Sequence, residues 1–97
     1  MFNGLSLRFY PNGNVKSQQI LVDGQTHGAA KHWRPDSSLI SEISYQAGQL
    51  HGESRYFYAD GSTQEVLRFS CGQMIYAARY DERGLKNYER NYRERTA

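Results

Sequence analysis

A unit of 24 residues occurs three times in this chain without insertion or deletion, as Gly4–His27, Gly28–His51 and Gly52–Ile75. Every copy begins with glycine and carries an aromatic residue at the same later position, namely Phe9, Trp33 and Phe57. A fixed period of this size is typical of a stacked array, in which each unit buries its apolar side chains against its neighbours. The repeat therefore predicts an elongated, repetitive architecture.

Two turn signals divide each copy into two strands. The first is Pro11-Asn12-Gly13 with its counterparts, and the second is Asp23-Gly24 with its counterparts. Glycine and asparagine tolerate the positive φ that tight hairpins need. The stretches between the turns are rich in β-branched and aromatic residues. We therefore expect an all-β, antiparallel β-hairpin array that forms a single elongated meander sheet, with strands near 5–10, 15–22, 29–34, 39–46, 53–58, 63–70, 74–81 and 85–92.

A chain of 97 residues makes a single small domain, here 1–97, built from three repeats and a degenerate copy over 76–97. That last copy is charged and atypical, as terminal repeats that cap a stack are. Within it, Leu85, Tyr88 and Tyr92 fit either a strand or one side of a short helix.

Alternation along the strands sorts the side chains into two faces. We expect a buried face with the aromatic column Phe9, Trp33 and Phe57, followed by Val15, Leu39 and Thr63, then Gln19, Ile43 and Leu67, then Leu21, Tyr45 and Phe69. The exposed face carries Arg8, His32 and Tyr56, then Tyr10, Arg34 and Tyr58. Ile20, Ile40 and Val66 fit this division poorly, because they fall on the exposed side.

Charge and cysteine content exclude several classes of protein. The net charge of +2 lies entirely in residues 79–97, a stretch that also contains four acidic residues. A solvated cap therefore explains this stretch better than a nucleic-acid site does. One cysteine provides neither a disulfide framework nor a zinc pattern. We see no signal peptide and no membrane span, so we expect a cytoplasmic protein, or a piece of a larger one.

The polar residues form no catalytic set. His27 and His51 recur at one position, but copies roughly 9.5 Å apart do not converge on one metal, so we expect each ring to bond nearby backbone. Asp36 and Asp60 are expected to shape turns through their carboxylates. Cys71 has no consistent basic partner. We therefore expect no enzyme activity, no metal site and no cofactor.

Several motifs resemble the variant MORN repeat, namely Tyr10-Pro11-Asn12-Gly13, Val22-Asp23-Gly24-Gln25-Thr26-His27-Gly28 and Gln49-Leu50-His51-Gly52. The set over residues 4–84 looks like the bacterial YwqK-type proteins, which are commonly described as antitoxins of toxin–antitoxin pairs. In this chain glutamine occupies the usual lysine position of the repeat in all three copies. The resemblance implies a repeat module with a protein partner, for example a toxin.

The leading hypothesis is a non-enzymatic protein-binding module, an antitoxin or immunity-type protein. Tyrosine and arginine dominate binding hot spots, so we expect the partner to contact Tyr10, His32, Arg34, Tyr56 and Tyr58. The alternative is a scaffold that self-assembles through its open sheet edges. A peripheral membrane module is a weaker third hypothesis, because the repeat glutamines remove positive charge.

Overall fold

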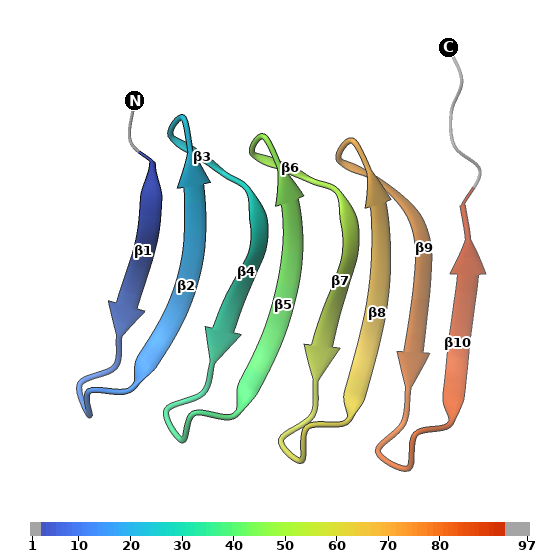
Figure 1. Ribbon diagram of the computed structural model, residues 1–97. Helices are drawn as coiled ribbons and strands as arrows, with labels where there is room; N and C mark the ends of the chain where they lie inside the picture. The colour runs from blue at the N-terminus through green and yellow to red at the C-terminus, as the bar shows by residue number, and fades with distance from the viewer. Residues whose placement is uncertain (1–2, 93–97) are drawn as a thin grey trace.

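The computed structural model describes residues 3–92, which form ten strands and no helix (Figure 1). The strands are β1 (Gly4–Phe9), β2 (Val15–Val22), β3 (Gln25–Thr26), β4 (Gly28–Trp33), β5 (Leu39–Gln46), β6 (Gln49–Leu50), β7 (Gly52–Phe57), β8 (Thr63–Ser70), β9 (Gln73–Tyr80) and β10 (Lys86–Asn91). The predicted strands and the all-β class are confirmed. Residues 85–92 contain the strand β10, so the strand is confirmed here in preference to a short helix. Residues 93–97 of the expected capping copy lie outside the described part.

All strands belong to one open antiparallel sheet with the order β1-β2-β4-β5-β7-β8-β9-β10. The short strands β3 and β6 pair with β2 and β5. The sheet measures 39 × 39 × 13 Å, so it is a single layer, and residues 3–92 place no second sheet or helix over either face. The predicted meander of hairpins is confirmed.

The longer turns, at the lower ends of the strands in Figure 1, are closed by short polar side chains. The Asp36 carboxylate accepts a hydrogen bond from the Ser38 amide at 2.9 Å, and Asp60 accepts one from Ser62 at the same distance. Asn12 acts in the same way in the first copy. The predicted turn role of Asp36 and Asp60 is confirmed.

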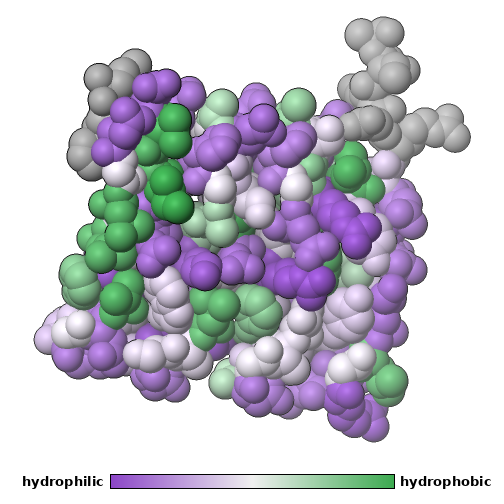
Figure 2. Space-filling model, viewed as in Figure 1, coloured by the Kyte–Doolittle hydropathy of each residue, from purple (hydrophilic) through white to green (hydrophobic). Residues whose placement is uncertain are grey.

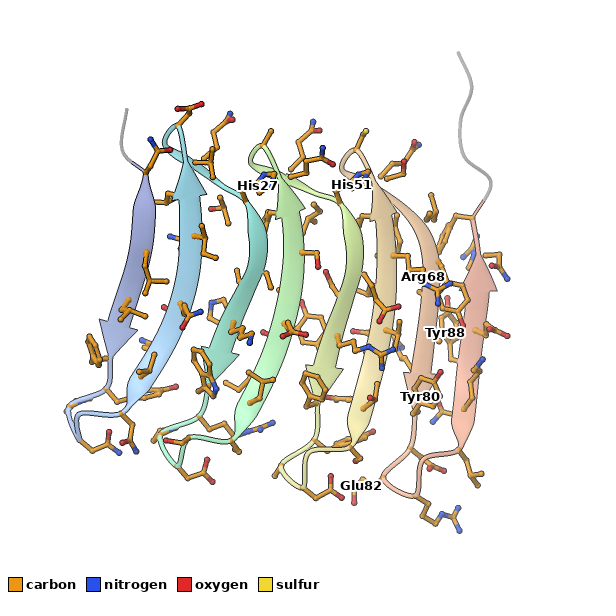
Figure 3. The ribbon with its side chains drawn as sticks, viewed as in Figure 1. His27, His51, Arg68, Tyr80, Glu82 and Tyr88 are labelled. Atoms are coloured by element: carbon orange, nitrogen blue, oxygen red, sulfur yellow. The ribbon has the colours of Figure 1, made fainter. Side chains whose placement is uncertain are left out.

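Two of the tight turns at the opposite ends are capped by a residue that lies just before the copy containing the turn. In the last of them, His51 Nδ1 accepts a hydrogen bond from the Cys71 amide at 3.0 Å. Asn3 is the first-copy counterpart of His51, and its Oδ1 atom accepts from the Asp23 amide at 2.7 Å. Figure 3 shows His27 at the equivalent place in the middle copy. The expectation that a repeated histidine bonds nearby backbone is confirmed at His51.

A β-bulge in each hairpin overturns the predicted division into faces. The register shifts between Arg8 and Phe9, and again at the equivalent points of the next two hairpins. Beyond the bulge Leu5 lies opposite Ile20, and residues opposite each other share a face. The extra residue therefore moves every side chain beyond the bulge in the return strand to the face opposite the one that simple alternation predicts.

We call the side with Phe9, Trp33, Phe57 and Tyr80 the aromatic face, and the side with Arg8, His32 and Tyr56 the reverse face. Ile20 and Val66 lie on the aromatic face, where Val66 is opposite Arg55. Leu67 lies opposite Ser54 on the reverse face. The prediction that Gln19, Ile43 and Leu67, together with Leu21, Tyr45 and Phe69, share the face of the aromatic column was therefore wrong.

The buried residues are small and central. Among the described residues the buried ones are Ala30, Ser41, Ser54, Val66, Ala77 and Ala78. Ser54 is 1% exposed although no second layer covers it. With so few buried residues, the sheet is stabilised by its backbone ladder and by cross-strand pairs rather than by an enclosed core.

Candidate functional site

Three of the expected partner contacts instead connect adjacent hairpins. The Tyr10 hydroxyl donates to the Trp33 carbonyl at 2.6 Å. Arg34 Nη2 donates to the Phe57 carbonyl at 2.9 Å, and the Tyr58 hydroxyl donates to the Tyr80 carbonyl at 2.7 Å. We call these three hydrogen bonds the inter-repeat clamps. Their partner-binding role stays a prediction, but removing Arg34 or Tyr58 also removes a structural contact.

The other two expected contacts, His32 and Tyr56, lie on the reverse face. They share this face with Arg8, and a hollow of about 130 Å³ separates Arg8 from His32. Small residues, Ser17 and Ala30, are among those that line it. The structure therefore arranges the five predicted residues as one row of clamps and one row of reverse-face side chains, rather than as one convergent site.

An exposed apolar patch is the feature that sequence reasoning missed. Its members are Leu5, Leu7, Phe9, Ile20 and Val22, which are 40% to 57% exposed. All five belong to β1 and β2, and the register places them on the aromatic face. Figure 2 shows the hydrophobic colour gathered over this first hairpin. We call these five residues the apolar patch.

Four of the five positions are polar in at least one of the next two copies, whereas Phe9 corresponds to the aromatic residues Trp33 and Phe57. Reading along the repeat, Leu5 corresponds to Ala29 and Glu53, Leu7 to Lys31 and Arg55, Ile20 to Ser44 and Arg68, and Val22 to Gln46 and Ser70. In the third copy Glu53 pairs with Arg55 at 2.6 Å and with Arg68 at 3.4 Å. The hydrogen bond from Arg55 lowers the pKa of the Glu53 carboxyl, which keeps it ionised. The fold therefore accepts charge at the columns of Leu5, Leu7 and Ile20, and the repeat does not require apolar residues there.

The sheet has two outer strands, β1 and β10, and β10 is covered with paired polar groups. Lys86 Nζ lies 2.9 Å from Glu89 Oε2, and the Tyr76 hydroxyl donates to the same carboxylate. The Arg79 guanidinium lies 5.1 Å from the centre of the Tyr88 ring, in the region labelled in Figure 3. Charged side chains on an edge strand discourage further strand pairing.

Other candidate chemistry receives little support from residues 3–92. In this part of the chain no three His, Cys, Asp or Glu side chains are grouped so that they could hold a metal ion. Cys71 is exposed in its turn, as a free thiol. No helix in the described residues is long and apolar enough to cross a membrane.

Comparison with known proteins detects a MORN repeat variant in this chain, in two segments. The sequence profile of this repeat matches residues 2–22 and 50–69, which cover the first hairpin and much of the third. No curated protein and no solved structure matches the chain significantly. MORN repeats are generally non-enzymatic modules that bind proteins or membranes.

Proposed function

We infer that this chain is a protein-binding repeat module whose partner covers the apolar patch. The observation that carries this proposal is a contrast between copies of the repeat. Leu5, Leu7 and Ile20 are apolar at the positions where the third copy carries an ion-paired cluster. Exposed apolar groups that the fold does not require are typical of interaction surfaces. The inter-repeat clamps and the capped turns hold this surface in one conformation before a partner arrives.

The size of the patch limits how much affinity it supplies. Covering what remains exposed of each of its five side chains contributes roughly 1 kcal/mol per residue. Association itself costs at least about 4 kcal/mol in lost translational and rotational freedom. The patch alone therefore supports weak binding, and a specific partner needs further contacts beside it.

The proposal is tested by giving the first hairpin the residues of the third. The variant Leu5→Glu, Leu7→Arg, Ile20→Arg recreates the Glu53–Arg55–Arg68 cluster, so it should fold normally. The matched control, Ala29→Glu, Lys31→Arg, Ser44→Arg, builds the same cluster in the second copy. We expect the control to retain a partner captured from the native host, and the first-hairpin variant to lose it. A partner that binds both variants with unchanged affinity contradicts the proposal.

The finer form of the proposal is that the partner is a toxin and this chain is its antitoxin, in the bacterial cytoplasm. The resemblance to YwqK-type proteins supports it, together with the detected MORN repeat variant. Co-expression with a toxic captured protein should restore growth, and the first-hairpin variant should fail to restore it. Restoration by both, or by neither, contradicts this form.

Self-assembly through the sheet edges is a second candidate, favoured by the outer edge of β1, since the charged side chains of β10 discourage pairing at the other edge. Chains that stack edge to edge should grow in mass as concentration rises. Light scattering across a wide concentration range tests this, and a strict monomer contradicts it.

A further inference from the structure

The outer edge of β1 lacks the neighbour that every equivalent strand has. β4, β7 and β9 begin their hairpins as β1 does, and each also pairs with the return strand of the preceding copy, β2, β5 or β8. Within the described residues β1 pairs with β2 alone. Its outer backbone groups are therefore free to pair with an added strand.

The β8–β9 pair is an internal template for that missing neighbour. Arg79 immediately precedes Tyr80 of the aromatic column, as Arg8 immediately precedes Phe9. Glu65 of β8 lies opposite Arg79, and its Oε2 atom is 3.0 Å from Arg79 Nε. The next pair in the register is Val66 opposite Ala78, the counterpart of Leu7. The other two inter-repeat pairs place Ser17 opposite His32 and Ser41 opposite Tyr56. A glutamate followed by an aliphatic residue is therefore what this fold places against the one forward strand that carries arginine, as β1 does, at this position.

Arg8 is placed to form an ion pair like the one between Arg79 and Glu65. It is exposed on the reverse face, beside the hollow that it shares with His32. Among residues 3–92 it makes no ion pair, whereas Arg79 in the equivalent position is paired with Glu65. An arriving carboxylate would be attracted to Arg8, and the residue after it would face the apolar patch at Leu7.

The backbone carbonyl of Phe9 is a second indication that an added segment binds at β1. The carbonyls of Trp33, Phe57 and Tyr80 each accept an inter-repeat clamp from the preceding copy. Phe9 begins this column, and no side chain of the described residues donates to its carbonyl. A donor on the added segment would complete the row.

We propose that the partner binds by adding an extended segment to β1, with a carboxylate opposite Arg8 and an aliphatic side chain opposite Leu7. This inference rests on the proposed protein-binding function and names its mode. Strand addition supplies main-chain hydrogen bonds for affinity and alternate side-chain contacts for specificity. These are the additional contacts that the apolar patch requires.

A second copy of this chain fits the same edge less well. Its free return strand, β10, carries Tyr88 and Glu89 where β8 carries Glu65 and Val66. Glu89 would then lie against Leu7, which places a charge on an apolar surface. In addition, Asp81 stands where Tyr10, Arg34 and Tyr58 supply clamp donors, and it accepts hydrogen bonds from Arg83 and Leu85 instead. The C-terminal end is therefore closed to extension, and a different protein is the better occupant.

The test uses the whole chain and a synthetic peptide with the β8 sequence, Thr63–Ser70. We expect the peptide to bind and to shift the amide resonances of β1, and a peptide with lysine in place of its glutamate to bind at least about fivefold more weakly. The variant Arg8→Glu should reverse this preference. Arg83→Glu, which changes the net charge equally but lies in the last turn, should leave it unchanged.

Three outcomes overturn the inference. They are shifts in β7 or β9 without shifts in β1, a preference that Arg8→Glu does not reverse, and binding of anionic vesicles in place of either peptide. The proposed function fails separately, because it requires the Leu5, Leu7 and Ile20 substitutions to release the captured partner. If those substitutions release the partner and Arg8→Glu does not weaken it, the binding function stands and strand addition at Arg8 is wrong.

Discussion

The two ends of this sheet are built from the same repeat, yet they present opposite surfaces. At the N-terminal end, β1 exposes Leu5, Leu7 and Phe9 next to Arg8, which makes no ion pair within residues 3–92. At the C-terminal end every residue of β10 is exposed, and Lys86 and Glu89 pair with each other. The hairpins between them are held in line by the inter-repeat clamps. A repeat array of this kind can therefore assign binding to one end and closure to the other without changing its fold.

The largest expected effect comes from removing the central clamp. Arg34 donates to the Phe57 carbonyl and also to the Leu39 carbonyl at 3.1 Å, so it ties the two halves of the sheet together. Arg34→Ala should lower the free energy of unfolding by about 2 kcal/mol, since charged hydrogen bonds contribute more than neutral ones. Urea denaturation measures this, with Arg8→Ala as the control that should change little. An unchanged stability would mean that the two ends are not coupled through Arg34.

Variants of the two tyrosine clamps, Tyr10 and Tyr58, should distinguish an effect on stability from an effect on partner binding. Tyr10→Phe and Tyr58→Phe each delete one hydroxyl donor, and each should cost about 1 kcal/mol of stability. Of these two tyrosines, only Tyr10 belongs to the hairpin that carries the apolar patch. Tyr10→Phe should therefore also weaken the captured partner, whereas Tyr58→Phe should not. Calorimetric titration of both variants checks this, and equal losses of affinity would contradict a binding site at the N-terminal end.

A smaller effect is expected in the central turn. Ser37 has φ of 74° where the other copies carry glycine, as at Gly13 with φ of 91°. A residue with a side chain is strained in this region, so Ser37→Gly should stabilise the protein by roughly 0.5 kcal/mol. Gly13→Ser should destabilise it by a similar amount, because a Cβ there meets no atom within 4 Å and only the backbone strain remains. Thermal unfolding of both variants measures the pair, and changes of the same sign would contradict this reasoning.

The smallest effect is a pH response confined to the C-terminal end. Two hydrogen bonds lower the pKa of the Glu89 carboxyl from its ordinary value of 4.5, and the one from Tyr76 has a larger effect than the one from Lys86. Because the folded-state pKa is depressed, this carboxylate stabilises the folded state above that value, and the contribution is lost as the pH falls through the folded-state pKa. Amide exchange in β10 should therefore speed up relative to β1 under acid. Glu89→Gln should remove the difference, and a response that persists in this variant would have another source.

The strands and turns could be predicted from sequence because each depends on local chemistry. Asp36 and Asp60 recur at the turn positions where a carboxylate accepts an amide two residues on, and that geometry is decided within the turn. The faces could not be predicted in the same way. One extra residue between Phe9 and Ser17 reverses every later side chain of the return strand, and a bulge leaves no clear signal in composition. The misplaced Ile20 and Val66 were the available sign of it.

The partner-binding role of the tyrosine and arginine residues stays a prediction, but the sequence does not show their structural role. Tyr10, Arg34 and Tyr58 donate to backbone carbonyls of the next copy. Apolar residues such as Leu5 and Leu7 are ordinary in a strand sequence, and only the single-layer structure shows that they stay exposed. Comparing each column across copies identifies the patch, once the register shows which columns share a face.

Hydrogen exchange of the full chain, alone and with its captured partner, tests the central claim that the N-terminal end is the binding end. The account predicts slower exchange of the β1 amides in the complex and unchanged exchange in β10. Protection of β10 with no change in β1 would contradict it.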